Sequence, residues 1–247
     1  MISSADIVRV FVGFDPREEV AIHVLSRSIW ERSSLPVTIT PVRLSHLEGV
    51  FTRARDPLQS TDFSFTRFLT PWLCDYQGWA LFTDCDMLVL DDIAKLWALR
   101  DDRYAVMCVK HDHRPKEEVK FLGAVQTKYE KKNWSSVMLF NCAKCTALTP
   151  DYVNMASGLE LHQFKWLGDD DLIGEIPDAW NHLVGYQDPR KGMSLVHYTV
   201  GGPYFNEYRD CEYSEEWNRE REAMLCCEQR EKGQADCASR NPRQDCE

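Results

Sequence analysis

Hydrophobic positions follow two rhythms along this chain, and the change from one to the other predicts strands that take turns with helices. Ile7 to Phe14 (IVRVFVGF) alternates β-branched and aromatic residues, the pattern of a strand, and it stops at Asp15-Pro16. The stretch that follows, REEVAIHVLSRSIWERSS, carries apolar residues at helical spacing. The chain is therefore expected to open with a strand, a turn and a helix.

The same alternation continues through the middle of the chain. We expect a second strand in LPVTITPVRL, broken by Pro41, and a helix in TDFSFTRFLTPWLCDY, interrupted by Pro71. Further strands are predicted at Trp79 to Thr83, at Tyr104 to Lys110 and in SSVMLFN, with a short helix around Ile93 to Leu99. This order predicts an α/β fold with a mostly parallel sheet that helices cover on both faces. Ligands of such sheets bind at the carboxyl ends of the strands.

Two aspartates interrupt the apolar run ALFTDCDMLVLDDI where a buried strand should end. In an extended backbone, residues two apart point to the same side, so the carboxylates of Asp84 and Asp86 are expected to converge while Cys85 turns away. Converging carboxylates repel each other unless a divalent cation lies beside them, and hard oxygen ligands favour magnesium or manganese. The alternative interpretation of an Asp-x-Asp pattern is a solvated turn with helix-capping aspartates.

Length, composition and charge narrow the class of protein. The chain has 247 residues, 44% of them hydrophobic, which suits one domain with a full core and excludes a disordered chain. A net charge of -10 argues against a nucleic-acid partner, which requires a basic surface. Met1 to Ile7 lacks the pattern of a signal peptide, and no window reaches the apolar length of a membrane span. We therefore expect a soluble, cytoplasmic protein without a transmembrane segment.

The ten cysteines fall into two groups. One group lies in apolar or helical contexts and is expected to be reduced and buried, namely Cys74, Cys85, Cys108, Cys142 and Cys145. The other group lies near the end of the chain, namely Cys211, Cys226, Cys227, Cys237 and Cys246. Because CCEQREKGQADCASRNPRQDCE is polar and lacks aromatic residues, it predicts a tail. A zinc site is the alternative, although paired metal-binding spacings are absent.

Several segments, in the right order, resemble one family of enzymes. WALFTDCDMLVLDDIAKLW resembles the metal-binding segment of nucleotide-sugar-dependent glycosyltransferases with the GT-A fold, most like family 8, which includes glycogenin and bacterial lipopolysaccharide galactosyltransferases. GFDP resembles the end of that family's first strand, and FSFTRFLTPWL its helix with a basic residue. NWSSVMLFN, LGDDDLIG and LVHYTVGGPYF resemble a later strand, the Asp-Gln-Asp motif and the late histidine motif. The resemblance implies a GT-A-like catalytic domain at 1–205, with a C-terminal helix and polar tail at 206–247.

Carried over position by position, the resemblance implies a metal site and a donor site. Asp84, Asp86 and His197 would hold the ion, Asp84 would also contact the ribose, and the imidazole favours manganese over magnesium. Without the resemblance, His197 would be interpreted as a core histidine. The residues implied to bind or act on the nucleotide sugar are Asp15, Arg67, Gly201 and Gly202, with Asp169 and Asp170 as catalytic residues at the donor sugar.

The chain departs from the family at three places. The last motif lacks the lysine that reaches the phosphate, so that charge would come from Arg67, from residues 110–132 or from nowhere. Trp134 stands where the family has an asparagine, and its ring would either stack on a sugar or fill the core. Asp170 replaces the glutamine of the Asp-Gln-Asp motif, and the acidic triplet Asp169 to Asp171 has the alternative role of a helix N-terminus.

The implied reaction moves a hexose from a nucleoside diphosphate sugar, expected to be UDP-linked, to a hydroxyl on a saccharide, glycolipid or small molecule, with retention at the anomeric carbon. A sugar nucleotidyltransferase would open with a glycine-rich loop, whereas GFDPREEV has one glycine. A haloacid-dehalogenase-type phosphatase would carry threonine or valine at the position of Leu88. A non-catalytic nucleotide-sugar-binding module is the third alternative, and the presence of Asp84, Asp86 and His197 together argues against it.

Overall fold

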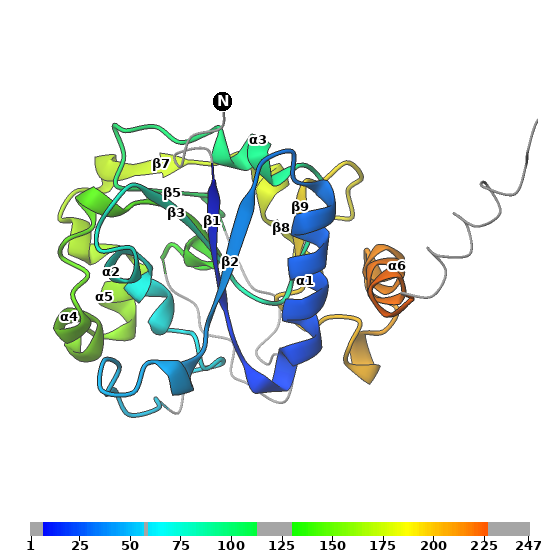
Figure 1. The fold of residues 1–247 in the computed structure, drawn as a ribbon, viewed down its shortest axis with the longest axis horizontal. Coiled ribbons are helices and arrows are strands. Elements are labelled where there is room, and N and C mark those ends of the chain that lie inside the picture. Colours follow the sequence, from blue (N-terminus) through cyan, green and yellow to red (C-terminus); the bar gives the residue numbers. More distant parts are fainter. Residues whose placement is uncertain (1–6, 57–58, 113–129, 227–247) are drawn as a thin grey trace, which may run out of the picture.

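A central six-stranded sheet organises the protein, whose computed structural model describes residues 7–56, 59–112 and 130–226 (Figure 1). The strands lie in the order β2-β1-β3-β6-β5-β7. β6 runs antiparallel to β3 and β5, while the remaining three pairings are parallel. The prediction of a mostly parallel sheet is therefore confirmed, with one strand reversed. The bounds are β1 Val8–Gly13, β2 Val37–Val42, β3 Trp79–Thr83, β5 Val106–Cys108, β6 Val137–Asn141 and β7 Ile173–Glu175.

Helices lie on both sides of this sheet, with α1 to the right of β1 in Figure 1 and α2, α4 and α5 to its left. α1 begins directly after a 3-10 turn, Pro16–Glu18, whose first backbone N–H is capped by the side chain of Asp15. The apolar residues on its inner face, among them Leu25 and Ile29, are buried, whereas Val20 and Trp30 are exposed. The bounds are α1 Glu19–Arg32, α2 Thr70–Leu73, α3 Ile93–Trp97, α4 Pro150–Met155, α5 Gly158–His162 and α6 Ser214–Leu225.

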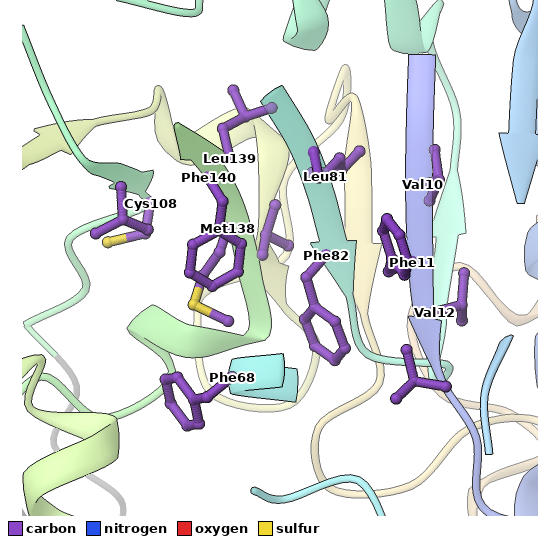
Figure 2. Packing of buried hydrophobic residues seen from close by; sticks show 14 of the residues in the cluster. Val10, Phe11, Val12, Phe68, Leu81, Phe82, Cys108, Met138, Leu139 and Phe140 are labelled. Atoms are coloured by element: carbon purple, nitrogen blue, oxygen red, sulfur yellow. The ribbon is translucent and has the colours of Figure 1, made fainter. Parts of the chain in front are cut away.

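The middle strands of the sheet carry the core (Figure 2). All residues of β6 are buried, and Leu81 and Phe82 of β3 have no exposed surface. Figure 2 shows Met138 and Phe140 of β6 beside Phe82 and near Phe68. Because both faces of these strands are covered, their sequences are continuously apolar rather than alternating. The sheet is therefore a rigid support for residues that follow its strands.

Two prolines act differently from what their sequence context predicted. Pro41 does not break its strand and pairs in register with Val12. It is tolerated because β2 is an edge strand, where the N–H that proline lacks can face away from the neighbouring strand. Pro71 does not interrupt a helix. It lies in the first turn of α2, where its lack of an N–H is harmless and its fixed φ suits the helix.

The chain leaves the central sheet at the two aspartates and enters a second, three-stranded sheet. Its strands are β4 Met87–Val89, β8 His182–Leu183 and β9 Leu195–His197, in the order β4-β9-β8. β4 pairs antiparallel with β9, which sets Met87 opposite His197. The same β4 packs against α1, where the Ser28 hydroxyl accepts a hydrogen bond from the backbone of Val89. This small sheet thus brings a late histidine to the Asp-x-Asp segment.

The C-terminal helix α6 packs against α1. Trp217 of α6 is fully buried, and the buried carboxylate of Glu220 pairs with Arg27 and Arg32 of α1. The tail predicted after Leu225 lies, apart from Cys226, outside the described residues, and the division at residue 205 stays a prediction. Within the part of the chain that the structure describes, no helix combines the length and apolar character of a membrane span.

Candidate metal centre and active site

Asp84, Asp86 and His197 come together in a buried cluster at the junction of the two sheets. Each offers one ligand atom, and these atoms lie within 4.8 Å of one another. Nε2 of His197 lies 3.3 Å from Oδ1 of Asp86 and 3.9 Å from Oδ2 of Asp84. The three residues are at most 8% exposed. Residues separated by more than a hundred positions in the sequence are therefore assembled into one group.

The backbone between the two aspartates differs from the expected extended strand. β3 ends at Thr83, residues 85 and 86 form a bend, and β4 begins at Met87. The backbone C=O of Asp86 accepts a hydrogen bond from the N–H of Tyr198, which ties the bend to β9. The carboxylates thus converge because the chain turns from one sheet into the other. As predicted, Cys85 is fully buried.

Asn181 holds the imidazole of His197 in one orientation. Its side-chain N–H donates to Oγ of Ser136 at 2.9 Å and to the carbonyl of Asn133 at 3.5 Å. Its amide oxygen therefore faces Nδ1 of His197, 3.1 Å away. Because a carbonyl oxygen only accepts, Nδ1 must donate, which leaves the lone pair of the neutral imidazole on Nε2, toward the aspartates.

This donor set fits a divalent cation. Two carboxylates and one imidazole lone pair face the same small volume, and acceptors this close repel one another unless a positive charge lies among them. Carboxylate oxygens suit magnesium and manganese, and the imidazole suits manganese better. His197 is oriented by Asn181, the arrangement that histidine ligands of metals commonly have.

Arg67 is buried beside the cluster rather than extended into solvent. Its Nη1 lies 2.7 Å from Oδ1 of Asp84 and donates to the carbonyl of Ser135 at 2.8 Å. Its guanidinium carbon lies 5.2 and 5.3 Å from the ring centroids of Phe63 and Phe82. The arginine predicted to reach the nucleotide sugar thus compensates the charge of a predicted ligand.

Asp15 fixes the turn after β1. Burial acts to raise the pKa of Asp15, but hydrogen bonds from the side chain and backbone of Arg17 and from the backbone of Asp62 outweigh it, so the pKa lies below its ordinary value. Nη2 of Arg17 lies 2.6 Å from the Asp15 carboxylate. Asp15 is thus ionised and engaged within the protein, and its contact with a nucleotide stays a prediction.

Gly201 and Gly202 have local steric reasons to lack a side chain. A Cβ on Gly201, which has φ of +150°, would lie 2.4 Å from the ring of Tyr208, and one on Gly202 would lie 2.3 Å from the ring of Tyr204. Tyr204 can fold back over this loop only because Gly202 leaves the space open. These steric reasons do not test the predicted contact of the two glycines with phosphate, which stays a prediction.

Asp169 and Asp170 are exposed at the start of a 3-10 turn, Asp170–Leu172. The Asp169 side chain caps this turn by accepting from the backbone of Asp171, which is the alternative role expected for the acidic triplet. Asp170 forms an ion pair with Lys131 at 2.5 Å, and this hydrogen bond lowers the pKa of Asp170. Nζ of Lys131 also lies 5.9 Å from the centroid of the Trp134 ring. Lys131 therefore connects Asp170 of the acidic triplet to Trp134.

Two buried polar residues of this region, Asn181 and Glu18, were not predicted from the sequence. Glu18 is 1% exposed, and burial, followed by the negative charge of Asp86, raises its pKa to about 8. Glu18 stands in a polar stretch, REEV, where nothing distinguishes it from a solvated helix residue. Asn181 follows Trp180 with no motif around it. Both are recognisable only from their tertiary contacts.

Replacing Asn181 by alanine is expected to weaken Mn²⁺ binding about 10- to 100-fold, the usual effect of removing a residue that orients a histidine ligand. The substitution frees Nδ1 of His197, so the imidazole can rotate or change its tautomer. The dissociation constant can be measured by the loss of the free Mn²⁺ signal in electron paramagnetic resonance. Gln163→Ala, a change in a partly buried amide that follows α5, is the control. Unchanged Mn²⁺ affinity in Asn181→Ala would contradict the role of Asn181.

No protein-family model matches the chain, but individual proteins do. It is 52% identical to Protein CDI of Arabidopsis thaliana over 223 residues, which are 87% of this chain and 86% of that protein. The structure of the bifunctional glycosyltransferase WbbM matches with a TM-score of 0.63 at 13% identity, covering 90% of this chain and 50% of WbbM. An active-site mutant of LgtC matches with a TM-score of 0.57 at 12% identity, covering 92% of this chain and 99% of LgtC. The chain therefore belongs to the family of Protein CDI and has the GT-A fold of glycosyltransferases.

Proposed function

We propose that the protein is a metal-dependent glycosyltransferase that moves a sugar from a nucleoside diphosphate sugar to a hydroxyl acceptor. The observation that carries the proposal is the buried Asp84, Asp86 and His197 cluster at the carboxyl end of β3 in a GT-A fold. Ligands of α/β sheets bind at that edge. A further LgtC structure with the same fold, at a TM-score of 0.51, is a galactosyltransferase in complex with donor and acceptor sugar analogues.

Each part of the site has a role in this reaction. Asp84, Asp86 and His197 would hold Mn²⁺ or Mg²⁺, and the bound ion stabilises the charge on the departing diphosphate as a Lewis acid. Asn181 keeps the lone pair of His197 on the correct nitrogen. Arg67 supplies a fixed positive charge beside Asp84. Asp169 and Asp170 would orient the donor sugar, with Lys131 holding Asp170 in place.

Several finer features belong to the same proposal. The donor is UDP-linked and carries a hexose, and transfer retains the anomeric configuration. The acceptor is a saccharide, a glycolipid or a small hydroxyl compound, and the protein acts in the cytoplasm. Retention requires either a carboxylate nucleophile or attack from the face of the leaving group. Asp170 is the carboxylate that the first route would use.

The test is Mn²⁺-dependent hydrolysis of a panel of nucleotide sugars by the purified protein. We expect release of the nucleoside diphosphate from at least one UDP-sugar, and loss of that release when EDTA removes the metal. Release of inorganic phosphate from phosphate monoesters would instead indicate a phosphatase, and formation of a nucleotide sugar from a nucleoside triphosphate would indicate a nucleotidyltransferase. Donor binding without turnover, even with candidate acceptors present, would indicate a binding module.

Removal of residues 227–247 is expected to leave Mn²⁺-dependent donor hydrolysis within about twofold of the full-length rate, because every proposed site residue precedes them. Removal of everything after Asp210 is the contrasting variant. It deletes Trp217 and Glu220, which anchor α6 to α1, and should abolish hydrolysis. Measuring both truncations against the intact chain separates the tail from α6. A large loss of hydrolysis in the variant that lacks only residues 227–247 would show that the tail belongs to the catalytic unit.

A further inference from the structure

Behind the Asp-x-Asp segment lies a buried polar cluster that the proposed reaction does not use. It consists of Glu18, Cys85 and Tyr204. The hydroxyl of Tyr204 donates to Oε1 of Glu18 at 2.9 Å, and the thiol of Cys85 donates to Oε2 at 3.7 Å. Glu18 is 1% exposed and Cys85 is fully buried. A buried carboxyl group without partners would be costly, and here each oxygen has one.

The position of this cluster connects it directly to the metal centre. Cys85 is the residue between Asp84 and Asp86, in the bend that turns both carboxylates toward His197. Backbone hydrogen bonds hold the bend at both ends, from Asp84 to Ser136 and from Tyr198 to Asp86, and side-chain contacts fix what lies between them. Glu18 provides such a contact from the turn that precedes α1.

Tyr204 brings a second, distant element to the same point. Its ring lies 5.5 Å from that of Trp217, centroid to centroid, and Trp217 is fully buried in α6. α6 is in turn fixed to α1 by Glu220 with Arg27 and Arg32. The turn before α1 and the bend between the aspartates therefore meet at one carboxyl group, and Tyr204 connects that group to α6.

We propose that Glu18 is a positioning residue of the metal centre: by accepting hydrogen bonds from Cys85 and Tyr204 it fixes the bend that carries Asp84 and Asp86, and it links that bend to α6. This inference rests on the proposed metal site. Glu18 acts here through hydrogen bonds, so a neutral side chain of the same shape that still bonds both Tyr204 and Cys85 preserves its role.

Two variants at Glu18 separate the effect of hydrogen bonding from that of charge. Glu18→Gln keeps an oxygen that accepts from Tyr204, and its NH2 group can donate to Sγ of Cys85 in place of the original bond, so we expect Mn²⁺ affinity within about threefold of wild type. Glu18→Ala removes both contacts and should weaken Mn²⁺ binding about 10- to 100-fold, the range typical of residues that orient ligands. Affinity is measured by electron paramagnetic resonance at pH 7.5 and well below the melting temperature of each variant.

Tyr204→Phe keeps the proposal testable if Glu18→Ala does not fold. It retains the ring on Trp217 and removes only the hydroxyl, and we expect Mn²⁺ affinity to fall about threefold to tenfold. Tyr76→Phe is the matched control, because its hydroxyl donates to the carbonyl of Leu148, where no proposed site residue lies. It should leave the affinity unchanged.

Four results would overturn the inference. Unchanged Mn²⁺ affinity in Tyr204→Phe, or an equal loss in Tyr204→Phe and Tyr76→Phe, would show that Glu18 only stabilises the fold. A loss in Glu18→Gln as large as in Glu18→Ala would show that charge, not hydrogen bonding, is what matters. A wild-type protein that does not bind Mn²⁺ would overturn the metal site and this inference together. Mn²⁺ binding without hydrolysis of any donor would instead refute the proposed reaction and leave these comparisons valid.

Discussion

Asp86→Asn is expected to weaken Mn²⁺ binding at least about 100-fold and to abolish metal-dependent sugar transfer, because the substitution removes a charged ligand from a site with three protein ligands. Asparagine has nearly the same shape, and its amide oxygen is a much weaker ligand than a carboxylate. The fold should be unaffected or slightly stabilised in the metal-free protein, since one of two neighbouring buried carboxylates is gone. Isothermal titration with Mn²⁺, together with donor hydrolysis, measures both effects.

The control for this experiment is Asp101→Asn. Asp101 pairs with an exposed arginine, Arg103, on the surface, so its substitution removes the same charge without touching the cluster. Asp86→Ala should behave like Asp86→Asn in binding and activity. Near wild-type hydrolysis in Asp86→Ala would refute the metal assignment, whatever the stability of the variant.

The fold was largely predictable because its strong signals are local. Continuous apolar runs such as the one ending at Thr83, and the helical spacing after Pro16, follow from the burial of a sheet between helices. The second sheet was not predictable. β8 has two residues, His182 and Leu183, and β4 and β9 have three each, so their existence depends on pairing partners that lie far away in the sequence.

The residues of the candidate site likewise divide into those that the sequence predicts and those that depend on tertiary contacts. Asp84 and Asp86 stand out because carboxylates interrupt an apolar run, and His197 was identified through the family resemblance rather than through its own context. Glu18 could not be found, because a polar residue in a polar stretch carries no sign of burial, and Asn181 could not be found, because no motif surrounds it. Their roles arise when the tertiary fold removes them from water and forces each polar atom to find a partner.

Arg67 was expected to bind the nucleotide sugar, and its burial changes what its removal should do. Its side chain is 7% exposed and its guanidinium pairs with the carboxylate of Asp84, whose side chain is 12% exposed. Removing one partner of a buried ion pair leaves the other charge uncompensated, at a cost of about 3 to 5 kcal/mol. The arginine therefore contributes to the stability of the metal-free protein as well as to donor binding.

Arg67→Ala is accordingly expected to lower the free energy of unfolding of the metal-free protein by about 3 kcal/mol, measured by urea denaturation. Saturating Mn²⁺ should recover part of this loss, since a cation beside Asp84 replaces the missing positive charge. Donor affinity in the presence of Mn²⁺ should also fall, by about 1.5 to 3 kcal/mol for each charge-assisted hydrogen bond lost. Arg103→Ala, which breaks an exposed pair with Asp101, should change neither quantity. A metal-free Arg67→Ala variant as stable as wild type would show that the charge of Asp84 is compensated by another group, and that Arg67 is not part of the metal centre.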